Sequence, residues 1–437
     1  MWVRSAIPLV TLLFAIIYAS DSLGQTAYEP LDPGGHIYLI EDAKETEELF
    51  VRRGLRFNDP ELQEIVDRVV KTIVPPALDE YIQYRVHLIR DPSPLAFSLA
   101  DGQIYLHTGL LARLDSEAQL AAVLAHEAHH IAMHDHIRAN KSRRTKSNVF
   151  GGIAFAMAGA NLHESMAGGT WGTAQYGLSL RSKFSDSMEF DADAGSIGLI
   201  GRAGYAPVAS LQALNTIMQD PELSTPSPLT SWTTLESLSK RQQQLQQLVD
   251  ELPGRSPSSA LGSNNRPLVL RRIIEMTVDD YIRVDRPGIA VELIDSMIAD
   301  QPSAFLLAAK GDAHQALGPR PVRDTEKRWK WQERKRDLLT RDELLEKYME
   351  EEDGPTLLAN NTKIAIESYN SALELDETTA RAHLGLGNLY LNRADYRHAG
   401  RNYIKYLKLS PDSLDRPLVL EKLQQIKTEL MKQKETE

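Results

Sequence analysis

The segment AAVLAHEAHHIAMHDHIR at residues 121–138 contains five of the twelve histidines of the chain. His126 and His130 are four positions apart, so on a helix both imidazoles lie on one face and can bind the same metal ion. Glu127 lies beside them and can take a proton from a metal-bound water. The spacing therefore predicts a zinc site with its own general base.

Two histidines supply only two ligands, whereas a catalytic zinc ion needs three protein ligands and one open position. His136 follows His126 by ten residues, but on an unbroken helix it would lie about 80° off the ligand face and about 15 Å further along the axis. The competing candidate is Glu189, which shares a helix face with Asp193. We favour a His-His-Glu site completed by Glu189, in which Asp193 accepts the second N–H of a zinc-bound imidazole.

The remaining histidines of the segment, His129, His134 and His136, fall on other faces of the expected helix. We expect them at the surface or behind the ligands rather than on the metal.

A helix must carry these ligands, and its start is visible in the sequence. Ser116 and Gln119 resemble a capping box that begins the histidine helix at about Glu117. A further helix is predicted for residues 187–204, which contain Glu189.

A helix and a sheet are expected before the histidine helix. The apolar spacing of residues 61–74, preceded by a capping segment at 58–60, predicts a helix. Residues 84–91 and 95–111 read as strands, with Asp101-Gly102 as a two-residue hairpin turn. These strands predict a small antiparallel sheet.

Composition limits the class of protein. At 437 residues and 42% apolar content, the chain can bury at least one full core, and we expect two or three domains. A formal charge of −11 argues against a nucleic-acid partner, because such proteins need clustered lysine and arginine.

The first 24 residues are typical of a signal peptide. An apolar run from Ala6 to Ala19 follows Arg4, is shorter than a membrane span and is interrupted by Pro8. The sequence has no cysteine, so we expect neither a lipid anchor on cysteine nor a disulfide. We expect export to a bacterial periplasm, with peripheral membrane association as a further option.

The C-terminal part carries a repeat pattern. Residues 382–411 fit a tetratricopeptide repeat, residues 290–302 supply one helix of an earlier repeat, and another repeat is split between 304–317 and 365–377. In the repeat at residues 382–411, the residues at the key positions of the pattern are Leu386, Gly387, Tyr390, Ala399, Tyr403 and Pro411.

Polar linkers divide the chain into three parts: a signal peptide at 1–24, a metallopeptidase-like domain at 25–255 and a repeat domain at 266–437 with a charged insertion at about 318–363. The fold class expected is α+β, mostly α, with a zincin-type domain followed by an α-helical solenoid. We read the charged segment 326–339 as a solvated helix and the Gly/Ala-rich segment 151–169 as a helix covering part of a cleft.

Three blocks in order, LAFSLADGQIYLHTGLL, LAAVLAHEAHHIAMHD and FSDSMEFDADAGSIGLI, resemble the HtpX- and Oma-type zinc peptidases over most of residues 80–205. The resemblance implies a zinc ion on His126, His130 and Glu189, with Glu127 as general base and Asp193 behind the ligands. For members with repeats, it implies degradation of misassembled outer-membrane proteins and help in their assembly.

Two further points follow from the resemblance. The family's His-Pro pair is replaced by Thr225-Pro226-Ser227-Pro228, so we expect no histidine latch on the metal. Arg241 is a candidate for steadying the reacting carbonyl, but we leave it outside the predicted site.

The hypothesis from the sequence is a zinc endopeptidase whose strand at Ile104–His107 holds unfolded or β-rich substrates by edge pairing. Its repeats would recruit a larger partner, such as the outer-membrane assembly machinery. The alternative is a tetratricopeptide chaperone or scaffold with a latent zinc site.

Overall fold

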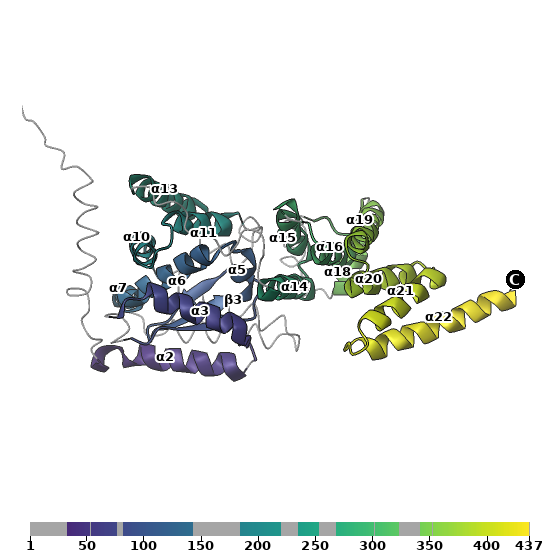
Figure 1. The fold of residues 1–437 in the computed structure, drawn as a ribbon, viewed down its shortest axis with the longest axis horizontal. Helices are drawn as coiled ribbons and strands as arrows, with labels where there is room; N and C mark the ends of the chain where they lie inside the picture. The colour runs from purple at the N-terminus through teal and green to yellow at the C-terminus, as the bar shows by residue number, and fades with distance from the viewer. Residues whose placement is uncertain are drawn as a thin grey trace, which may run out of the picture. The chain divides into compact units, whose positions relative to one another are not determined.

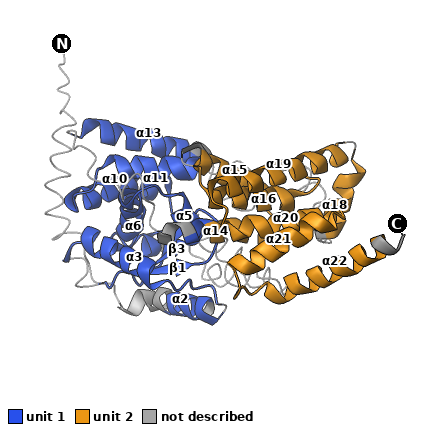
Figure 2. Ribbon diagram, turned by 45° about the vertical axis from the view of Figure 1, so that its right-hand side comes forward, with its two compact units in different colours: residues 1–274 blue, residues 275–437 orange. Residues whose placement is uncertain are grey.

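The computed structural model describes residues 33–52, 54–76, 82–142, 184–219, 235–252, 268–300, 302–322, 341–351 and 353–436. The expected signal peptide, the segments 151–169 and 326–339, and the loop with Thr225-Pro226-Ser227-Pro228 lie outside these residues. The chain divides into two compact units, Met1–Ile274 and Glu275–Glu437, which we describe separately (Figure 2).

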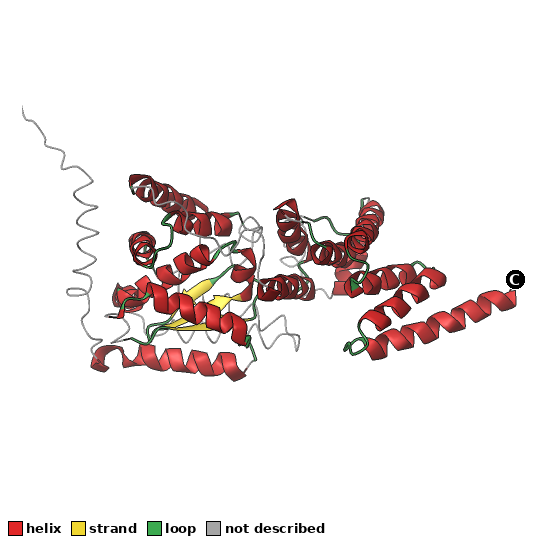
Figure 3. Cartoon of the chain, in the orientation of Figure 1, coloured by secondary structure: helices red, strands yellow, loops and turns green. Residues whose placement is uncertain are grey.

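The first unit contains a small sheet among helices (Figure 3). Its elements in chain order are α2 (Pro33–Arg52), α3 (Pro60–Ile73), β1 (Arg85–Ile89), β2 (Ala96–Ser98), β3 (Gln103–His107), α5 (Thr108–Arg113), α6 (Glu117–Ala132), α7 (Asp135–Ser142), α10 (Asp186–Arg202), α11 (Val208–Met218) and α13 (Leu235–Glu251). Helix α14 (Leu268–Arg283) spans the boundary between the units.

Helix α3 begins where the sequence predicts. The Asp59 side chain accepts a hydrogen bond from the Leu62 backbone N–H at 3.1 Å, and Pro60 occupies the first turn, where a missing N–H costs nothing. The apolar residues of the helix, among them Val66 and Val69, are buried. The predicted helix is therefore confirmed.

The sheet has the strand order β1-β3-β2 and is mixed, which corrects the expected antiparallel sheet. β2 and β3 form the predicted antiparallel pair, whereas β1 runs parallel to β3. The chain reverses direction from β1 to β2 and again from β2 to β3. β3 therefore runs parallel to β1, and it lies between the other two strands. The direction of such a non-local pairing is not encoded in local hydrophobic spacing.

Two local details of this region also differ from expectation. The hairpin turn spans residues 99–102, with the Gly102 N–H donating to the Leu99 carbonyl at 3.3 Å and Gly102 at φ +93°. The strand predicted to run to residue 111 ends at His107, and α5 follows. A short apolar run does not distinguish strand from helix by its periodicity.

Successive side chains of β2 point to opposite faces of the sheet, and the two faces have different neighbours. Phe97 packs into a core cluster with Phe50 and Tyr105, the two rings of Phe97 and Tyr105 being stacked at 5.1 Å between centroids. Ala96 and Ser98 therefore point to the other face. That face meets α6, which packs against β2 and β3 (Figure 1).

The second unit is helical throughout the part that is described. Its remaining elements are α15 (Pro287–Asp300), α16 (Ala304–Leu317), α18 (Arg341–Glu350), α19 (Gly354–Leu375), α20 (Ala380–Asn392), α21 (Tyr396–Leu409) and α22 (Arg416–Thr436). Helix α16 packs against α19, as the split repeat requires, and α20 packs against α21.

The contact of α20 with α21 explains one residue of the repeat pattern. A Cβ at Gly387 would lie 2.6 Å from Cε1 of Tyr403, so only glycine permits the two helices to approach this closely. Together with the mixed sheet of the first unit, these helices confirm the expected fold class, α+β and mostly α.

No helix within the described ranges is long and apolar enough to cross a membrane.

Candidate active site

Helix α6 presents the predicted ligand pair in the interior of the first unit. The Ser116 side chain accepts a hydrogen bond from the Gln119 backbone N–H at 3.2 Å, which starts the helix at Glu117 as expected. His126 and His130 lie one turn apart, with their rings edge to face at 4.7 Å between centroids. Their Nε2 atoms are 3.1 Å apart, so both nitrogens point at the same small volume.

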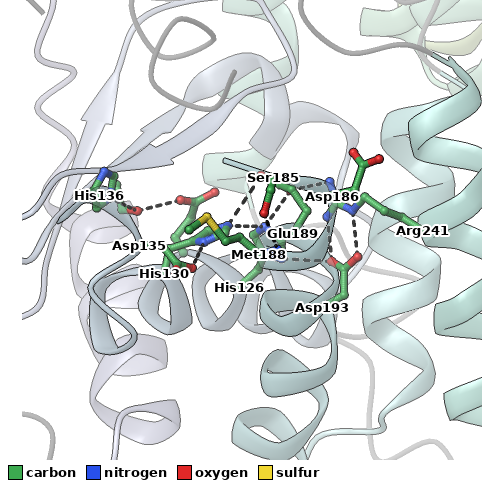
Figure 4. Close-up of polar contacts among 12 residues, drawn as sticks. His126, His130, Asp135, His136, Ser185, Asp186, Met188, Glu189, Asp193 and Arg241 are labelled. Carbon is green, nitrogen blue, oxygen red and sulfur yellow. Dashed lines mark hydrogen bonds and ion pairs between the residues drawn. The ribbon is translucent and has the colours of Figure 1, made fainter. Parts of the chain in front are cut away.

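Helix α10 brings the third predicted ligand from a distant part of the sequence. Oε2 of Glu189 is 3.5 Å from His126 Nε2, and its Oε1 is 3.7 Å from His130 Nε2. One ligand atom from each of the three residues lies within 4.8 Å of the others, and all three residues are buried. Figure 4 shows the three side chains converging from the two helices.

A glycine lets α10 approach α6 this closely. A Cβ at Gly195 would lie 1.9 Å from Cδ2 of His129, because the imidazole occupies that space. His129 is therefore a packing residue between the two helices rather than a solvated one. Its burial lowers its pKa to about 4, so the ring is neutral at pH 7.

The three ligands fit a zinc ion. A tetrahedral ion with bonds of about 2.0–2.1 Å separates its ligand atoms by about 3.3 Å. The distances of 3.1, 3.5 and 3.7 Å among the two Nε2 atoms and the Glu189 oxygens are close to this value.

The other nitrogen of each imidazole faces a carboxylate. His126 Nδ1 is 3.0 Å from Asp193 Oδ1, and His130 Nδ1 is 2.8 Å from Asp135 Oδ2. An ionised carboxylate only accepts hydrogen bonds, so Nδ1 carries the proton and the Nε2 lone pair is left for a metal. The structure thus places Asp193 where the sequence predicts, and Asp135 is a residue that sequence reasoning missed.

The negative charge of the site favours a cation. Burial alone would lower the pKa of His126, but its hydrogen bonds with Asp193 and Glu189 outweigh burial and raise it to about 9. Without a metal ion, the ring therefore holds a proton at pH 7.

Asp135 reaches the site because α6 ends earlier than expected. The helix stops at Ala132, and His134 adopts φ +52°, a left-handed conformation that only a few per cent of residues other than glycine adopt. Helix α7 then starts at Asp135, which is fully buried. The unbroken helix on which His136 was placed in the sequence analysis is therefore not observed.

The break also moves His136, which is buried rather than displaced along a continuous helix. Its Nε2 lies 3.3 Å from Ser98 Oγ. The metal-binding group found among the described residues consists of His126, His130 and Glu189 and does not include His136.

Arg241 on α13 belongs to the site, although the sequence prediction left it out. Its Nε and Nη2 donate to both oxygens of Asp193 at 2.8 and 2.7 Å, and its Nη1 lies 2.7 Å from Glu189 Oε2. Burial alone would raise the pKa of Asp193, but the charge and hydrogen bonds of Arg241, together with His126, lower it to about 2. Arg241 therefore keeps Asp193 ionised behind the ligand. The family resemblance had singled out Arg241 for the reacting carbonyl, but nothing in the sequence indicated its contacts with Asp193 and Glu189.

Glu127 lies beside the ligands and is 2% exposed. With His126 it lines a cavity of about 50 Å³, which has room for a water molecule. Apolar residues of α6 and α11, including Val123, Leu214 and Ile217, form much of the rest of the lining. A water in this cavity would have both a ligand histidine and a carboxylate base as neighbours.

Two histidines from a His-Glu-x-x-His helix and a glutamate from a second helix are the ligand set of the His₂Glu class of metallopeptidases. Residues 57–252 match the model of peptidase family M48, which confirms the resemblance seen in the sequence. Residues 360–392 match a tetratricopeptide repeat.

Two further proteins are similar to parts of the chain. The chain is 26% identical over 176 residues to the beta-barrel assembly-enhancing protease of Escherichia coli strain K12, which is 39% of this chain and 36% of that protein. It is 33% identical over 146 residues to mitochondrial metalloendopeptidase OMA1 of Schizosaccharomyces pombe, which is 33% of this chain and 41% of that protein. The match thus spans only about a third to two fifths of the length of these curated relatives.

Proposed function

We propose that the chain is a zinc-dependent endopeptidase of the bacterial periplasm that degrades misfolded or misassembled envelope proteins. The observation that carries the proposal is the convergence of His126, His130 and Glu189 on one small volume, with Glu127 beside it. The similar proteins are named as a protease and a metalloendopeptidase, which supports the same activity.

The side chains divide the work of hydrolysis. A zinc ion held by His126, His130 and Glu189 would polarise the scissile carbonyl and acidify a water. Glu127 takes the proton of that water and later delivers it to the leaving amine. Asp193 and Asp135 hold the two imidazoles in the tautomer that leaves Nε2 available.

The strand that holds the substrate must be reassigned. The sequence hypothesis used residues 104–107, but β3 is the central strand and is paired on both sides. Ala96 of β2 lines the same cavity as Glu127. We infer that an extended substrate segment lies against β2 at this cavity.

Periplasmic location is part of the proposal and rests on the signal-like first 24 residues. The repeat helices of the second unit are the proposed contact for a larger protein partner, since such repeats commonly bind proteins. The name of the E. coli relative refers to beta-barrel assembly, which favours a partner in that process.

Substitution of Glu127 tests the proposal. Casein, a loosely folded substrate, is incubated with the purified chain with and without a chelator. We expect chelator-sensitive cleavage by the wild type and none by Glu127→Gln, while zinc content stays near one per chain in both. Glu64→Gln, an exposed acid on α3, serves as the matched control and should cleave normally.

The alternative function, a tetratricopeptide scaffold with a latent zinc site, has one observation in its favour. Arg241 already pairs with the Glu189 carboxylate, which could keep that oxygen from a metal. Zinc-loaded wild-type protein that cleaves neither casein nor unfolded outer-membrane proteins would favour this alternative over the enzyme.

A further inference from the structure

Glu127 is tied to the sheet by a hydrogen bond that the reaction scheme above does not use. The Ser98 hydroxyl donates to Glu127 Oε2 at 2.9 Å. On its other side, Ser98 Oγ lies 3.3 Å from His136 Nε2. The three side chains are buried, at 1%, 2% and 9% exposure for Ser98, Glu127 and His136.

The direction of this chain of hydrogen bonds follows from its members. A hydroxyl has one proton, and an ionised carboxylate can only accept, so the proton of Ser98 goes to Glu127. The remaining contact of Ser98 Oγ must then be an acceptor contact. His136 therefore carries its proton on Nε2 and donates it to Ser98, and the two donors point in sequence toward the Glu127 carboxylate.

Two features of the fold place Ser98 against Glu127 and His136 against Ser98. Alternation along β2 turns Ser98 toward α6, while Phe97 enters the core on the opposite face. The left-handed residue His134 ends α6 and starts α7, which brings His136 back toward β2. A continuous helix would have carried His136 away along the axis.

We propose that Ser98 and His136 form a positioning pair that orients the carboxylate of the general base. The inference rests on the proposed function, since it gives Glu127 its role in hydrolysis. The pair fixes the carboxylate with respect to both the ligand helix and β2, the strand on which the substrate would lie. A carboxylate held in this way is already oriented toward the attacking water, so the reaction does not require a further loss of its conformational entropy.

The kinetic test replaces Ser98 in the full, zinc-loaded chain. We expect Ser98→Ala to lower kcat by on the order of tenfold with KM and zinc content unchanged, because a positioned base contributes about 10²–10⁴-fold in total. Ser98→Thr, which keeps a hydroxyl, should recover most of the rate. His136→Gln should lower kcat in the wild type but have no further effect in the Ser98→Ala background.

Ser93→Ala is the matched control, since Ser93 is also a buried serine that donates to a carboxylate, that of Asp91, at 2.6 Å. It should leave kcat unchanged. An unaltered kcat in Ser98→Ala, or an equal loss in Ser93→Ala, would overturn the proposal.

A second measurement does not depend on activity. The free energies of unfolding of the wild type, Ser98→Ala, Glu127→Ala and the double variant form a cycle, and we expect the two single costs to be non-additive. Additive costs would refute the hydrogen bond itself. If no variant and no wild type cleaves but the cycle shows coupling, then the proposed function fails while the contact between Ser98 and Glu127 stands.

Discussion

Each imidazole of the candidate ligand pair is fixed by a carboxylate from a different element: His126 by Asp193 of α10, and His130 by Asp135 of α7. These contacts decide which ring nitrogen is free, and that choice turns two nearby histidines into a ligand pair. Arg241 supports one of these contacts from behind. It keeps Asp193 ionised, so that Asp193 remains a hydrogen-bond acceptor for His126.

The identity of the third ligand gives the first prediction at this scale. Glu189→Ala should lower zinc content well below one per chain after dialysis, because two histidines alone hold a structural or catalytic zinc poorly. His136→Ala should retain zinc, since His136 contacts Ser98 instead. The reverse pattern in elemental analysis would assign the site to His136.

Burial of His129 predicts a pH dependence of stability. The pKa of His129 is about 4 in the folded chain, against 6.5 when unperturbed. Between pH 4 and 6.5, His129 is therefore protonated in the unfolded chain and neutral in the folded chain. The free energy of unfolding should therefore fall as pH drops from 6.5 to 4, by up to about 3 kcal/mol from this residue. His129→Gln should show a shallower decline in denaturant titrations across that range, and identical slopes would refute the assignment.

At the scale of elements, the histidine helix illustrates what sequence patterns can and cannot predict. Its start at Ser116 and the i, i+4 ligand pair follow from local rules, and both were predicted. Its end was not, because the break at His134 involves neither glycine nor proline. Asp135 was missed for the same reason, since on a continuous helix it would have pointed elsewhere.

Non-local geometry explains the other misses. The parallel pairing of β1 with β3 depends on which strand inserts between the others, and the hydrophobic pattern of each strand is the same in either arrangement. Arg241 lies 48 residues after Asp193, beyond the reach of any helical period. Glu189 was predicted because zinc chemistry requires a third ligand, and the family resemblance implied the same residue.

The close contact of α6 and α10 gives a prediction at this scale. Gly195→Ala places a methyl group on the His129 ring, which should cost about 1–3 kcal/mol of stability and weaken zinc binding by shifting Glu189. Gly198→Ala on the same helix meets open space and should stabilise the chain by up to about 1 kcal/mol. Equal effects of the two substitutions in thermal unfolding would show that the helices are not packed as described.

At the scale of the whole molecule, the candidate chemistry is confined to one of two units. The M48 match at residues 57–252 lies within the first unit, and the repeat match at residues 360–392 lies within the second. Such a division lets one unit cut peptide bonds while the other binds proteins, as the proposed function requires.

Anomalous diffraction at the zinc edge, from crystals of the purified chain, tests the central claim most directly. We predict one zinc peak per chain, at about 2.0–2.2 Å from His126 Nε2, His130 Nε2 and a carboxylate oxygen of Glu189. A strong peak elsewhere in the molecule, or an empty site in protein that contains stoichiometric zinc, would contradict the account.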